Sequence, residues 1–320
     1  MTKKIAILTS GGDAPGMNAV IRGVTRYALA KQWQVYGIVR GYEGLLHQEM
    51  IPLGRRDVGE IIHRGGTMLR TARCAAFYQE EKRREAAAFL QNQGIEALVV
   101  IGGDGSMRGA QGLSAYGIVT MVIPGTIDND MEGTQYTIGF DTAVNTVLSS
   151  VNKIRDTAFS HERVAVIEVM GRSAGFIALE AGMAAGAEVV LVPEYAVNLE
   201  DVCTQLSRSH EQKKMSSIVI VAEGASTGNE VAAYIKAHTS LETNLTVLGY
   251  VQRGGSPSAY DAVMAGRFAQ CAVDSLAAHK KNCVIGLWEQ QVVATPYEEA
   301  QAFRYPLDHN LYTLVHILGR

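Results

Sequence analysis

The sequence has little of the chemistry that builds covalent or metal-based frameworks. Four of its 320 residues are cysteine, and none of them forms a Cys-x-x-Cys pair or stands near a histidine at zinc-finger spacing. This scarcity argues against a disulfide framework or a structural zinc site and favours reduced thiols. The eight histidines form no His-Glu-x-x-His pattern or comparable metal set. His161 lies in an arginine-flanked loop, where a surface role is expected.

A strong net charge and a long apolar run are also missing. The formal net charge is −3, which leaves no basic footprint for nucleic acid and no Lys/Arg block for an anionic membrane. The longest stretch without a charged residue, 109–127, contains glycines, Pro124 and polar residues, so it is a poor membrane span. The apolar run in "MTKKIAILTSGG" is too short for a signal peptide. We therefore expect a soluble, cytoplasmic protein without membrane or nucleic-acid partners.

What the sequence does contain is an ordinary globular composition, with 47% hydrophobic residues, and recurrent apolar, β-branched runs. These runs are continuous rather than alternating, as in strands that are covered on both faces. They lie at residues 4–8, 97–101, 118–123, 163–169, 188–192 and 217–222. Helical patterns such as 18–30 and 80–94 separate them, and this alternation predicts an α/β fold with parallel sheets and right-handed crossovers. No low-complexity linker divides the chain, so two domains would require the chain to cross between them more than once.

Three of the predicted strands end in glycine-rich turns. The turns read "TSGGDAPGMN" (9–18), "IGGDGS" (101–106) and "PGTIDND" (124–130). Ligands of open parallel sheets bind beyond the carboxyl ends of the strands, so these turns can converge on one site. The first turn alone is as consistent with a capped tight turn as with phosphate binding.

The second turn has the residues of a phosphate-binding loop. Gly102, Gly103 and Gly105 allow backbone N–H groups to turn inward, and Ser106 would open a helix whose positive end favours phosphate. Asp104 beside such a loop suits Mg²⁺, which uses one or two carboxylates together with substrate phosphates. Neither GxxxxGK[ST] nor GxGxxG is completed, which excludes a Walker P-loop and counts against a dinucleotide-binding Rossmann domain.

The third turn carries two carboxylates, Asp128 and Asp130, on one short loop. One carboxylate can accept a proton from an attacking hydroxyl while the other helps to hold metal-bound phosphate. Thr126 adds a hydroxyl donor. A solvated Asx-turn has the same spacing, so these residues alone leave both interpretations open.

Arginines recur beside small residues, and a hydrolase motif lies among them. Arginines within glycine turns, at 64–73, 155–163, 170–175 and 252–257, indicate bidentate phosphate clamps. However, "GRSAG" also matches Gly-x-Ser-x-Gly between a strand and a helical pattern, the context of a nucleophile elbow. The hydrolase hypothesis would use Ser173 with Asp261 or Asp274 and His279 or His309. It leaves the acidic loop and the phosphate-binding loop without a task.

Five segments, taken together, indicate one protein family more specifically than any of them does alone. They are "TSGGDAPGMNAVIRG", "VIGGDGS", "PGTIDND", "HERVAVIEVMGR" and "VLGYVQRGGSP". Their order and spacing resemble the ATP-dependent 6-phosphofructokinase family of bacterial glycolysis. The resemblance implies transfer of the γ-phosphoryl group of MgATP to the 1-hydroxyl of fructose 6-phosphate, in a homotetramer whose neighbouring subunits complete the sugar site. It also implies two three-layer αβα domains with mainly parallel sheets and the active site in the cleft between them. The larger, ATP-binding domain would comprise 1–138 and 252–303, and the smaller, sugar-phosphate-binding domain 139–251 and 304–320.

The resemblance also implies roles for individual residues. Asp128 would be the general base, with Thr126 and Arg172 stabilising charge on the transferred phosphoryl group. Asp104 would hold the Mg²⁺ cofactor, with Asp130 nearby. The implied ATP-binding residues are Gly12, Arg73, Cys74, Gly103, Asp104, Gly105 and Ser106. The implied sugar-phosphate residues are Thr126, Ile127, Asp128, Arg163, Met170, Gly171, Arg172, Glu223, Asn244, Tyr250, Val251, Gln252 and Arg253.

Some positions depart from the family's pattern. Arginine and histidine are usual where this chain has Asn244 and Tyr250. Losing a charge-assisted hydrogen bond costs roughly 1.5–3 kcal/mol. The sugar is therefore expected to bind more weakly, or to be another ketohexose phosphate such as tagatose 6-phosphate. Gly105 and Gly125 stand where pyrophosphate-using relatives typically carry an aspartate and a lysine, and they point to ATP.

An effector site for ADP or phosphoenolpyruvate between subunits is also implied. Arg22 and Arg26 are one helical turn apart and so share a helix face. The residues that match this site are Arg22, Arg26, Arg55, Arg155, Gly186, Glu188 and Lys214. The basic cluster expected at 212–216 survives only in Lys213 and Lys214, so we expect a weaker effector response than is usual in the family.

Overall fold

The structure, a computed structural model, describes residues 3–319 and contains two compact units, each formed by two separate segments. Unit 1 comprises Met1–Asp141 and Arg253–Tyr305, and unit 2 comprises Thr142–Gln252 and Pro306–Arg320. The domain boundaries expected from the sequence follow residues 138, 251 and 303. The ligand that each unit takes remains a proposal.

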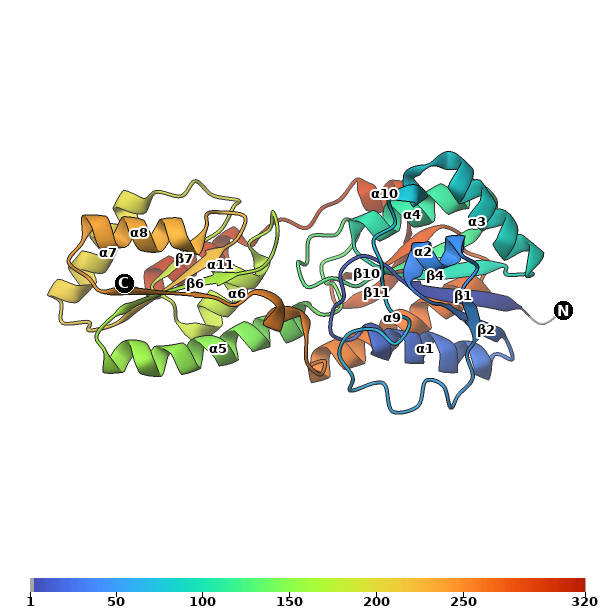
Figure 1. Cartoon of the computed structure of the whole chain (residues 1–320), viewed down its shortest axis with the longest axis horizontal. Helices are drawn as coiled ribbons and strands as arrows, with labels where there is room; N and C mark the ends of the chain where they lie inside the picture. The colour runs from blue at the N-terminus through green and yellow to red at the C-terminus, as the bar shows by residue number, and fades with distance from the viewer. Residues whose placement is uncertain (1–2, 320) are drawn as a thin grey trace. The chain divides into compact units, whose positions relative to one another are not determined.

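A seven-stranded mixed sheet forms the centre of unit 1 (Figure 1). Its strands are, in spatial order, β11 (Gln291–Pro296), β10 (Cys283–Trp288), β5 (Val119–Pro124), β4 (Ala97–Gly102), β1 (Lys4–Thr9), β2 (Gln34–Ile38) and β3 (Met50–Pro52). The inner strands run parallel, and β11 and β3 pair antiparallel at the two edges. Every residue of β4 is buried, as expected of a strand covered on both faces. The parallel sheet that the apolar runs predicted is confirmed.

Helices cover both faces of this sheet and make unit 1 a three-layer structure. α1 (Met17–Ala30) and α9 (Ala259–Ala277) lie together on one face, and α3 (Glu80–Asn92) and α4 (Asp104–Ser114) lie on the other (Figure 1). The close packing of α1 on α9 requires a glycine, because a Cβ on Gly23 would lie 2.7 Å from Ala269 Cβ. The shorter elements of this unit are α2 (Gly41–Leu46), the 3₁₀ helix η1 (Ala75–Tyr78) and α10 (Tyr297–Gln301).

Unit 2 is built around a four-stranded sheet in which all neighbours are parallel. The spatial order is β7 (Val189–Leu191), β8 (Ser217–Ala222), β6 (Val164–Val169) and β9 (Thr243–Val247). The helices are α5 (Phe140–Ser160), α6 (Phe176–Ala185), α7 (Leu199–Glu211), α8 (Gly228–His238) and α11 (His309–Leu318). The 3₁₀ helix η2 (Gly249–Arg253) follows β9 along the chain. α7 and α8 pack on one face of the sheet, and α5 runs on the opposite side (Figure 1). α8 begins with a capping box between Thr227 and Glu230, the sequence signal that fixes its first residue.

Candidate active site

The three glycine turns begin at the same end of the sheet in unit 1, where the neighbouring strands β1, β4 and β5 have their carboxyl ends. In the register of β4 and β5, Gly102 lies opposite Pro124. On the other side of β4, Thr9 of β1 lies opposite Ile101. Ser10 N, the first group beyond β1, donates a hydrogen bond to Ile101 O at 3.0 Å. The turns that follow β1, β4 and β5 therefore start side by side, as the sequence predicted.

The turn after β1 packs against an arginine from the second segment of unit 1. A Cβ on Gly12 would lie 2.6 Å from Arg253 Nη1, which also donates to a main-chain carbonyl of this turn at 3.2 Å. Thr71 Oγ1 donates to Gly11 O at 2.8 Å and ties the segment that carries Arg73 to the same turn. The structure thus brings Gly12 and Arg253 together. Arg73 is exposed and lies two residues after Thr71, which contacts this turn.

The turn after β4 opens α4 and leaves space beside its first residues. Gly103 is the N-cap, and a Cβ on Gly105 would meet no atom within 4 Å. Ser106 is buried, and among the partners available within residues 3–319 its Oγ finds no hydrogen bond. Backbone N–H groups at a helix start, the positive end of the helix dipole and a hydroxyl form an arrangement that binds phosphate.

An aromatic pair that the sequence did not predict lies beside α4. Tyr42 and Phe77 stack with ring centroids 4.1 Å apart. Tyr42 OH donates to Ser106 O at 2.6 Å, and a Cβ on Gly109 would lie 2.5 Å from Tyr42 Cε2. Tyr42 thus supports the first turns of α4, although it lies 64 residues before Ser106 in the chain. No local sequence pattern signals such a contact.

Carboxylates gather where α4 begins. Burial raises the pKa of Asp104, and the negative charges of Asp130 and Glu132 raise it further. The positive charges of Arg304 and Arg108 oppose this rise. Arg304 Nη2 also donates to Asp130 O at 3.0 Å. The site is therefore short of positive charge close to Asp104.

This donor set fits a magnesium ion. Asp104 Oδ1 is a buried atom that finds no hydrogen-bond partner within residues 3–319. Carboxylate oxygens are the ligands that Mg²⁺ prefers, and it takes its other ligands from water and substrate phosphates. Over the same described range, no group of three or more His, Cys, Asp or Glu side chains could hold a metal ion by itself. A metal here would therefore take its remaining ligands from water and substrate phosphates.

The loop after β5 is buried, which contradicts its interpretation as a solvated turn. Asp128 is 0% exposed and Asp130 9% exposed, and Ile127 is also buried. Asp128 N donates to Thr126 Oγ1 at 3.3 Å, and Thr126 Oγ1 donates to Asp128 Oδ2 at 3.2 Å. A Cβ on Gly103 would lie 3.8 Å from Thr126 Cβ, so this loop adjoins the start of α4.

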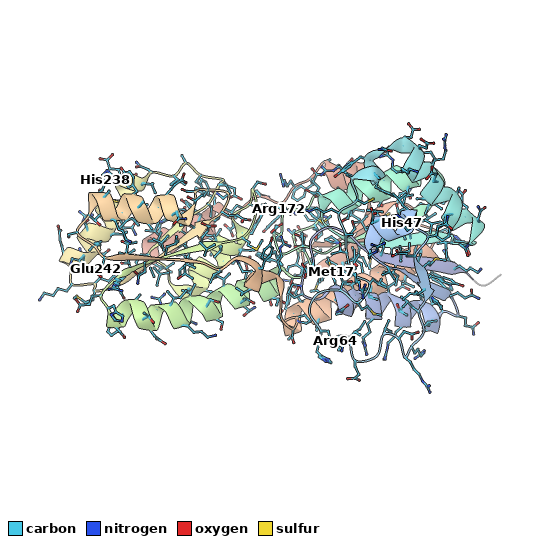
Figure 2. The ribbon with its side chains drawn as sticks, in the orientation of Figure 1. Met17, His47, Arg64, Arg172, His238 and Glu242 are labelled. Atoms are coloured by element: carbon cyan, nitrogen blue, oxygen red, sulfur yellow. The ribbon has the colours of Figure 1, made fainter. Side chains whose placement is uncertain are left out.

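In unit 2, the turn after β6 presents Arg172 (Figure 2). Gly171 has a φ of +144° and Arg172 a φ of +54°, both in the range that favours glycine. Glu223 Oε1 accepts the N–H of Gly171 at 3.2 Å and of Arg172 at 2.8 Å. Gln252 Oε1 accepts the N–H of Met170 at 3.1 Å. Five of the residues expected to bind the sugar phosphate therefore lie together.

Two of the other expected sugar-phosphate residues of unit 2, Arg163 and Asn244, lie away from this turn, at the opposite end of β6. Arg163 precedes β6 and Arg172 follows it, and a strand of 6 residues separates the two by roughly 20 Å at about 3.3 Å per residue. Arg163 Nε pairs with Glu242 Oε2 at 2.7 Å. Glu242 lies just before β9 (Figure 2). Asn244 is exposed, and so are Tyr250 and Val251, which precede Gln252 in η2. One chain does not bring Arg163 to Arg172.

Comparison with known proteins agrees with this geometry. A family model described as phosphofructokinase matches residues 4–276. The chain belongs to the phosphofructokinase family. It is 49% identical over 318 residues to an ATP-dependent 6-phosphofructokinase of Clostridium botulinum, an alignment that covers 99% of this chain and 100% of that protein. ATP-dependent 6-phosphofructokinase 1 of Clostridium perfringens has the same identity and coverage.

A solved phosphofructokinase has the same fold. The crystal structure of Pichia pastoris phosphofructokinase in the T-state superposes with a TM-score of 0.90 at 36% sequence identity. The match covers 94% of this chain and 36% of that longer chain. The family and the α/β fold that the motifs indicated are confirmed.

The expected effector residues of unit 1 lie close to one another in this family member. Arg26 Nη2 donates to Arg55 O at 3.4 Å. Arg22 precedes Arg26 by one turn on α1. The three arginines therefore share one region of unit 1.

The expected effector residues of unit 2 also gather. Arg155 donates to Ala185 O, next to Gly186, which ends α6 in a left-handed conformation. Lys214 Nζ pairs with Glu188 Oε1 at 2.6 Å, and the side chain of Glu188 is 3% exposed. The charge of Lys214 is therefore already balanced within the unit.

The geometry gives the hydrolase hypothesis no support. The left-handed residues of the turn after β6 precede Ser173. Asp274 pairs with Lys31 at 2.9 Å, and His309 Nδ1 bonds Tyr195 OH at 2.9 Å. No hydrogen bond joins Ser173 to a histidine in the part of the chain that the structure describes, residues 3–319. A nucleophile, base and acid are not assembled around this serine.

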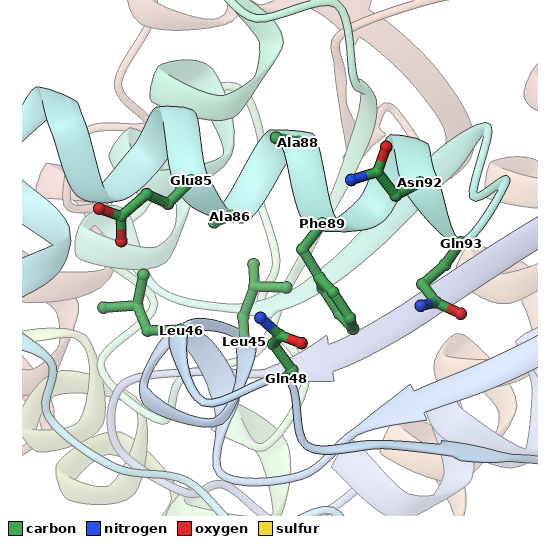
Figure 3. A pocket seen from close by; sticks show the side chains of 9 residues that line it. All are labelled: Leu45, Leu46, Gln48, Glu85, Ala86, Ala88, Phe89, Asn92 and Gln93. Atoms are coloured by element: carbon green, nitrogen blue, oxygen red, sulfur yellow. The ribbon is translucent and has the colours of Figure 1, made fainter.

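A pocket of about 480 Å³ lies between α2 and α3 of unit 1 (Figure 3). Leu45 and Leu46 of α2 and Phe89 of α3 form its apolar part. Glu85, its charged lining residue, pairs with Lys82 at 2.8 Å. None of the residues expected to bind ATP or sugar phosphate lines this pocket, so it is not part of the candidate site.

Proposed function

We propose that this chain transfers the γ-phosphoryl group of MgATP to the 1-hydroxyl of fructose 6-phosphate, giving fructose 1,6-bisphosphate and ADP in glycolysis. The observation that carries the proposal is the buried acidic loop with Asp128 and Asp130, which adjoins Asp104 at the start of α4. Carboxylates beside a phosphate-binding helix start suit phosphoryl transfer, where a protein mainly positions groups and stabilises charge. The 49% identity with ATP-dependent 6-phosphofructokinases over 318 residues supports these substrates.

Asp128 is the proposed general base. Its carboxylate, held by Thr126 Oγ1, accepts the proton of the sugar hydroxyl as that oxygen attacks the γ-phosphorus and the bond to the ADP oxygen breaks. Arg172 and Thr126 stabilise the charge on the transferred group. Asp104, with Asp130 nearby, would hold Mg²⁺, which would supply positive charge to the phosphates of the nucleotide.

The remaining residues position the two substrates. The nucleotide is bound by Gly12, Arg73, Cys74, Gly103, Asp104, Gly105 and Ser106. The sugar and its 6-phosphate are bound by Thr126, Ile127, Arg163, Met170, Gly171, Glu223, Asn244, Tyr250, Val251 and Arg253. Gln252 is fully buried, and its amide bonds Met170 N and Gly249 O, so it supports Met170 instead of contacting the sugar.

A neighbouring copy of the chain completes the sugar site in the proposed homotetramer. The separation of Arg163 from Arg172, roughly 20 Å within one chain, supports this proposal, because it is longer than a hexose phosphate. Exposed apolar side chains such as Val251 and Ile317 are available for contacts between copies. ADP or phosphoenolpyruvate would bind at the two arginine-containing groups described above, with a response weakened by the pairing of Lys214 with Glu188.

We place this activity in the cytoplasm. Within residues 3–319, none of the helices has the length and apolar character needed to cross a membrane. The substrates are phosphorylated metabolites of glycolysis, which supports this location.

A second candidate substrate is another ketohexose phosphate such as tagatose 6-phosphate. It is favoured by Asn244 and Tyr250, which stand where the family usually has an arginine and a histidine for the sugar phosphate. Coupled assays over a panel of ketohexose phosphates decide between the two, since the preferred sugar will have the higher kcat/KM.

Release of ADP in the presence of MgATP and fructose 6-phosphate tests the proposed function. Asp128→Asn keeps the size of the side chain and removes the base, so kcat is expected to fall about 10²–10⁴-fold. Ser173→Ala is the matched control and should retain activity, whereas a serine hydrolase would lose it. Sugar-independent ADP release by the wild-type protein, or full activity of Asp128→Asn, would contradict the proposal.

A further inference from the structure

Asn129, between the two carboxylates of the acidic loop, has an unfavourable backbone conformation. Its φ is +55°, in the left-handed region that residues other than glycine seldom occupy, although asparagine tolerates it better than most. The residue is 7% exposed, so solvent does not stabilise it. A conformation of this kind persists where the surrounding structure fixes it, and such residues cluster at functional sites.

The side-chain amide of Asn129 supplies the contacts that fix this conformation. Its Oδ1 accepts the N–H of Thr137 at 2.8 Å, and its Nδ2 donates to the C=O of Gln135 at 3.3 Å. The amide therefore joins the acidic loop to the returning segment, residues 135–139. Both an acceptor and a donor are needed, so aspartate could make only the first of these bonds and glycine neither.

The returning segment is itself anchored to the scaffold of unit 1. Thr137 Oγ1 donates to Thr126 O at 2.6 Å. Tyr136 OH and Gly139 N donate to Asp261 Oδ1 at 2.6 Å and 2.7 Å, and Asp261 is a fully buried residue of α9. Through these bonds, the amide of Asn129 connects the acidic loop to an element that has little freedom to move.

We propose that Asn129 is the positioning residue for Asp128: its amide bonds to the returning segment hold the left-handed turn that aims the Asp128 carboxylate. This inference rests on the proposed function, in which Asp128 is the general base. The side-chain bonds of Asn129 go to the main chain of residues 135 and 137, so it acts through the loop and not on a substrate. A displacement of about 1 Å at a reacting group can cost about 100-fold in rate.

Asn129→Gly isolates the amide, because glycine adopts this φ freely and makes neither side-chain bond. We expect kcat to fall about 30- to 100-fold while the KM for ATP stays within about threefold, since nucleotide-binding groups are untouched. Asn282→Gly is the matched control. Asn282 also has a φ of +55°, and its Oδ1 accepts Thr120 N at 3.2 Å, on the strand β5 but at the end away from the acidic loop. Its kcat should stay within about twofold of wild type.

A double-substituted protein tests whether Asn129 acts through Asp128. In the Asp128→Asn background, adding Asn129→Gly should change the residual turnover less than about threefold, because the base that it positions is gone. If Asn129→Gly does not fold, Thr137 tests the anchoring of the segment to which the Asn129 amide binds: Thr137→Val loses the bond to Thr126 O and should lower kcat, whereas Thr137→Ser keeps it and should not.

Wild-type kcat in folded Asn129→Gly would overturn the inference. A loss of the same size in the Asp128→Asn background would overturn it as well. Absence of sugar-dependent ADP release by the wild-type protein would instead refute the proposed function on which the inference rests.

Discussion

A carboxylate introduced at Gly105 is predicted to block ATP binding without disturbing the fold. Gly105 lies in the first turn of α4, and a Cβ added there meets no atom within 4 Å. Replacing a helical glycine removes a penalty of roughly 0.5–1 kcal/mol. A negative charge in the first turn adds about 0.3–1 kcal/mol through the helix dipole. The negative charges of Asp104, Asp130 and Glu132 oppose these gains, so Gly105→Asp should have a stability close to that of the wild-type protein.

The effect on ATP follows from charge repulsion. The proposed phosphates lie against the same turn, so the new carboxylate would stand about 5 Å from a phosphate oxygen, where an effective dielectric constant of about 20 gives a repulsion of about 3 kcal/mol. This corresponds to a rise of about 100-fold or more in the KM for ATP. Gly105→Ala adds a methyl group without charge, so its KM should rise less than about tenfold.

Initial rates of ADP formation at varied ATP, together with thermal melting curves, measure both expectations. Gly266→Asp is the matched control, because Gly266 is a glycine of α9 whose added Cβ also meets no atom within 4 Å. It should leave the KM for ATP unchanged. A Gly105→Asp protein with an undiminished Tm and a wild-type KM for ATP would refute the placement of the nucleotide at α4.

Two further results concern titratable groups. Burial, with a hydrogen bond to Glu43, raises the pKa of Cys74 to about 11. Iodoacetamide at pH 8 should therefore label Cys74 about tenfold more slowly than a free cysteine, and MgATP should slow the labelling further; a rate like that of a free thiol would contradict this. Burial and the charge of Asp130 raise the pKa of Asp104, so its ionised form destabilises the metal-free fold above the usual pKa near 4. Asp104→Asn should therefore raise Tm by about 1–3 °C at pH 7. Below about pH 4, where Asp104 is protonated as well, the Tm values of the two proteins should be equal. An unchanged Tm of Asp104→Asn at neutral pH would count against the raised pKa.

The strands that the sequence predicted well are those whose environment, buried on both faces of a sheet, accepts only apolar residues. The runs at 97–101 and 217–222 became β4 and β8, where both faces of the sheet are covered and every residue is buried. The edge strands β3, β9 (TNLTV) and β11 (QVVATP) were not among the predicted runs, and neither were the inner strands β2 and β10. An edge strand is partly solvated, so polar residues interrupt its apolar pattern.

The residues of the candidate site also fall into two groups, those that the sequence predicted and those that it did not. Asp104 and Asp128 follow neighbouring parallel strands, so the register of the sheet brings them together, and strand-turn patterns were sufficient to find them. Tyr42, Asp261 and Arg304 were missed as supports of the site. They reach it across long stretches of chain, 125 residues for the bond from Tyr136 to Asp261, and only tertiary packing creates such contacts.

Both units place a residue other than glycine in left-handed backbone at a group with a proposed role in phosphoryl transfer or directly beside one. In unit 1 this residue is Asn129, and in unit 2 it is Arg172. Glycine would adopt either conformation without the roughly 1–2 kcal/mol that other residues lose there. The side chain must therefore be worth more than the strain, for its amide bonds in the first case and for its charge in the second. Hydrogen bonds with other segments offset the strain. The amide of Asn129 bonds the returning segment 135–139, and the N–H of Arg172 donates to Glu223 Oε1. The orientation of the groups proposed to touch the substrates thus depends on hydrogen bonds made away from the reacting atoms.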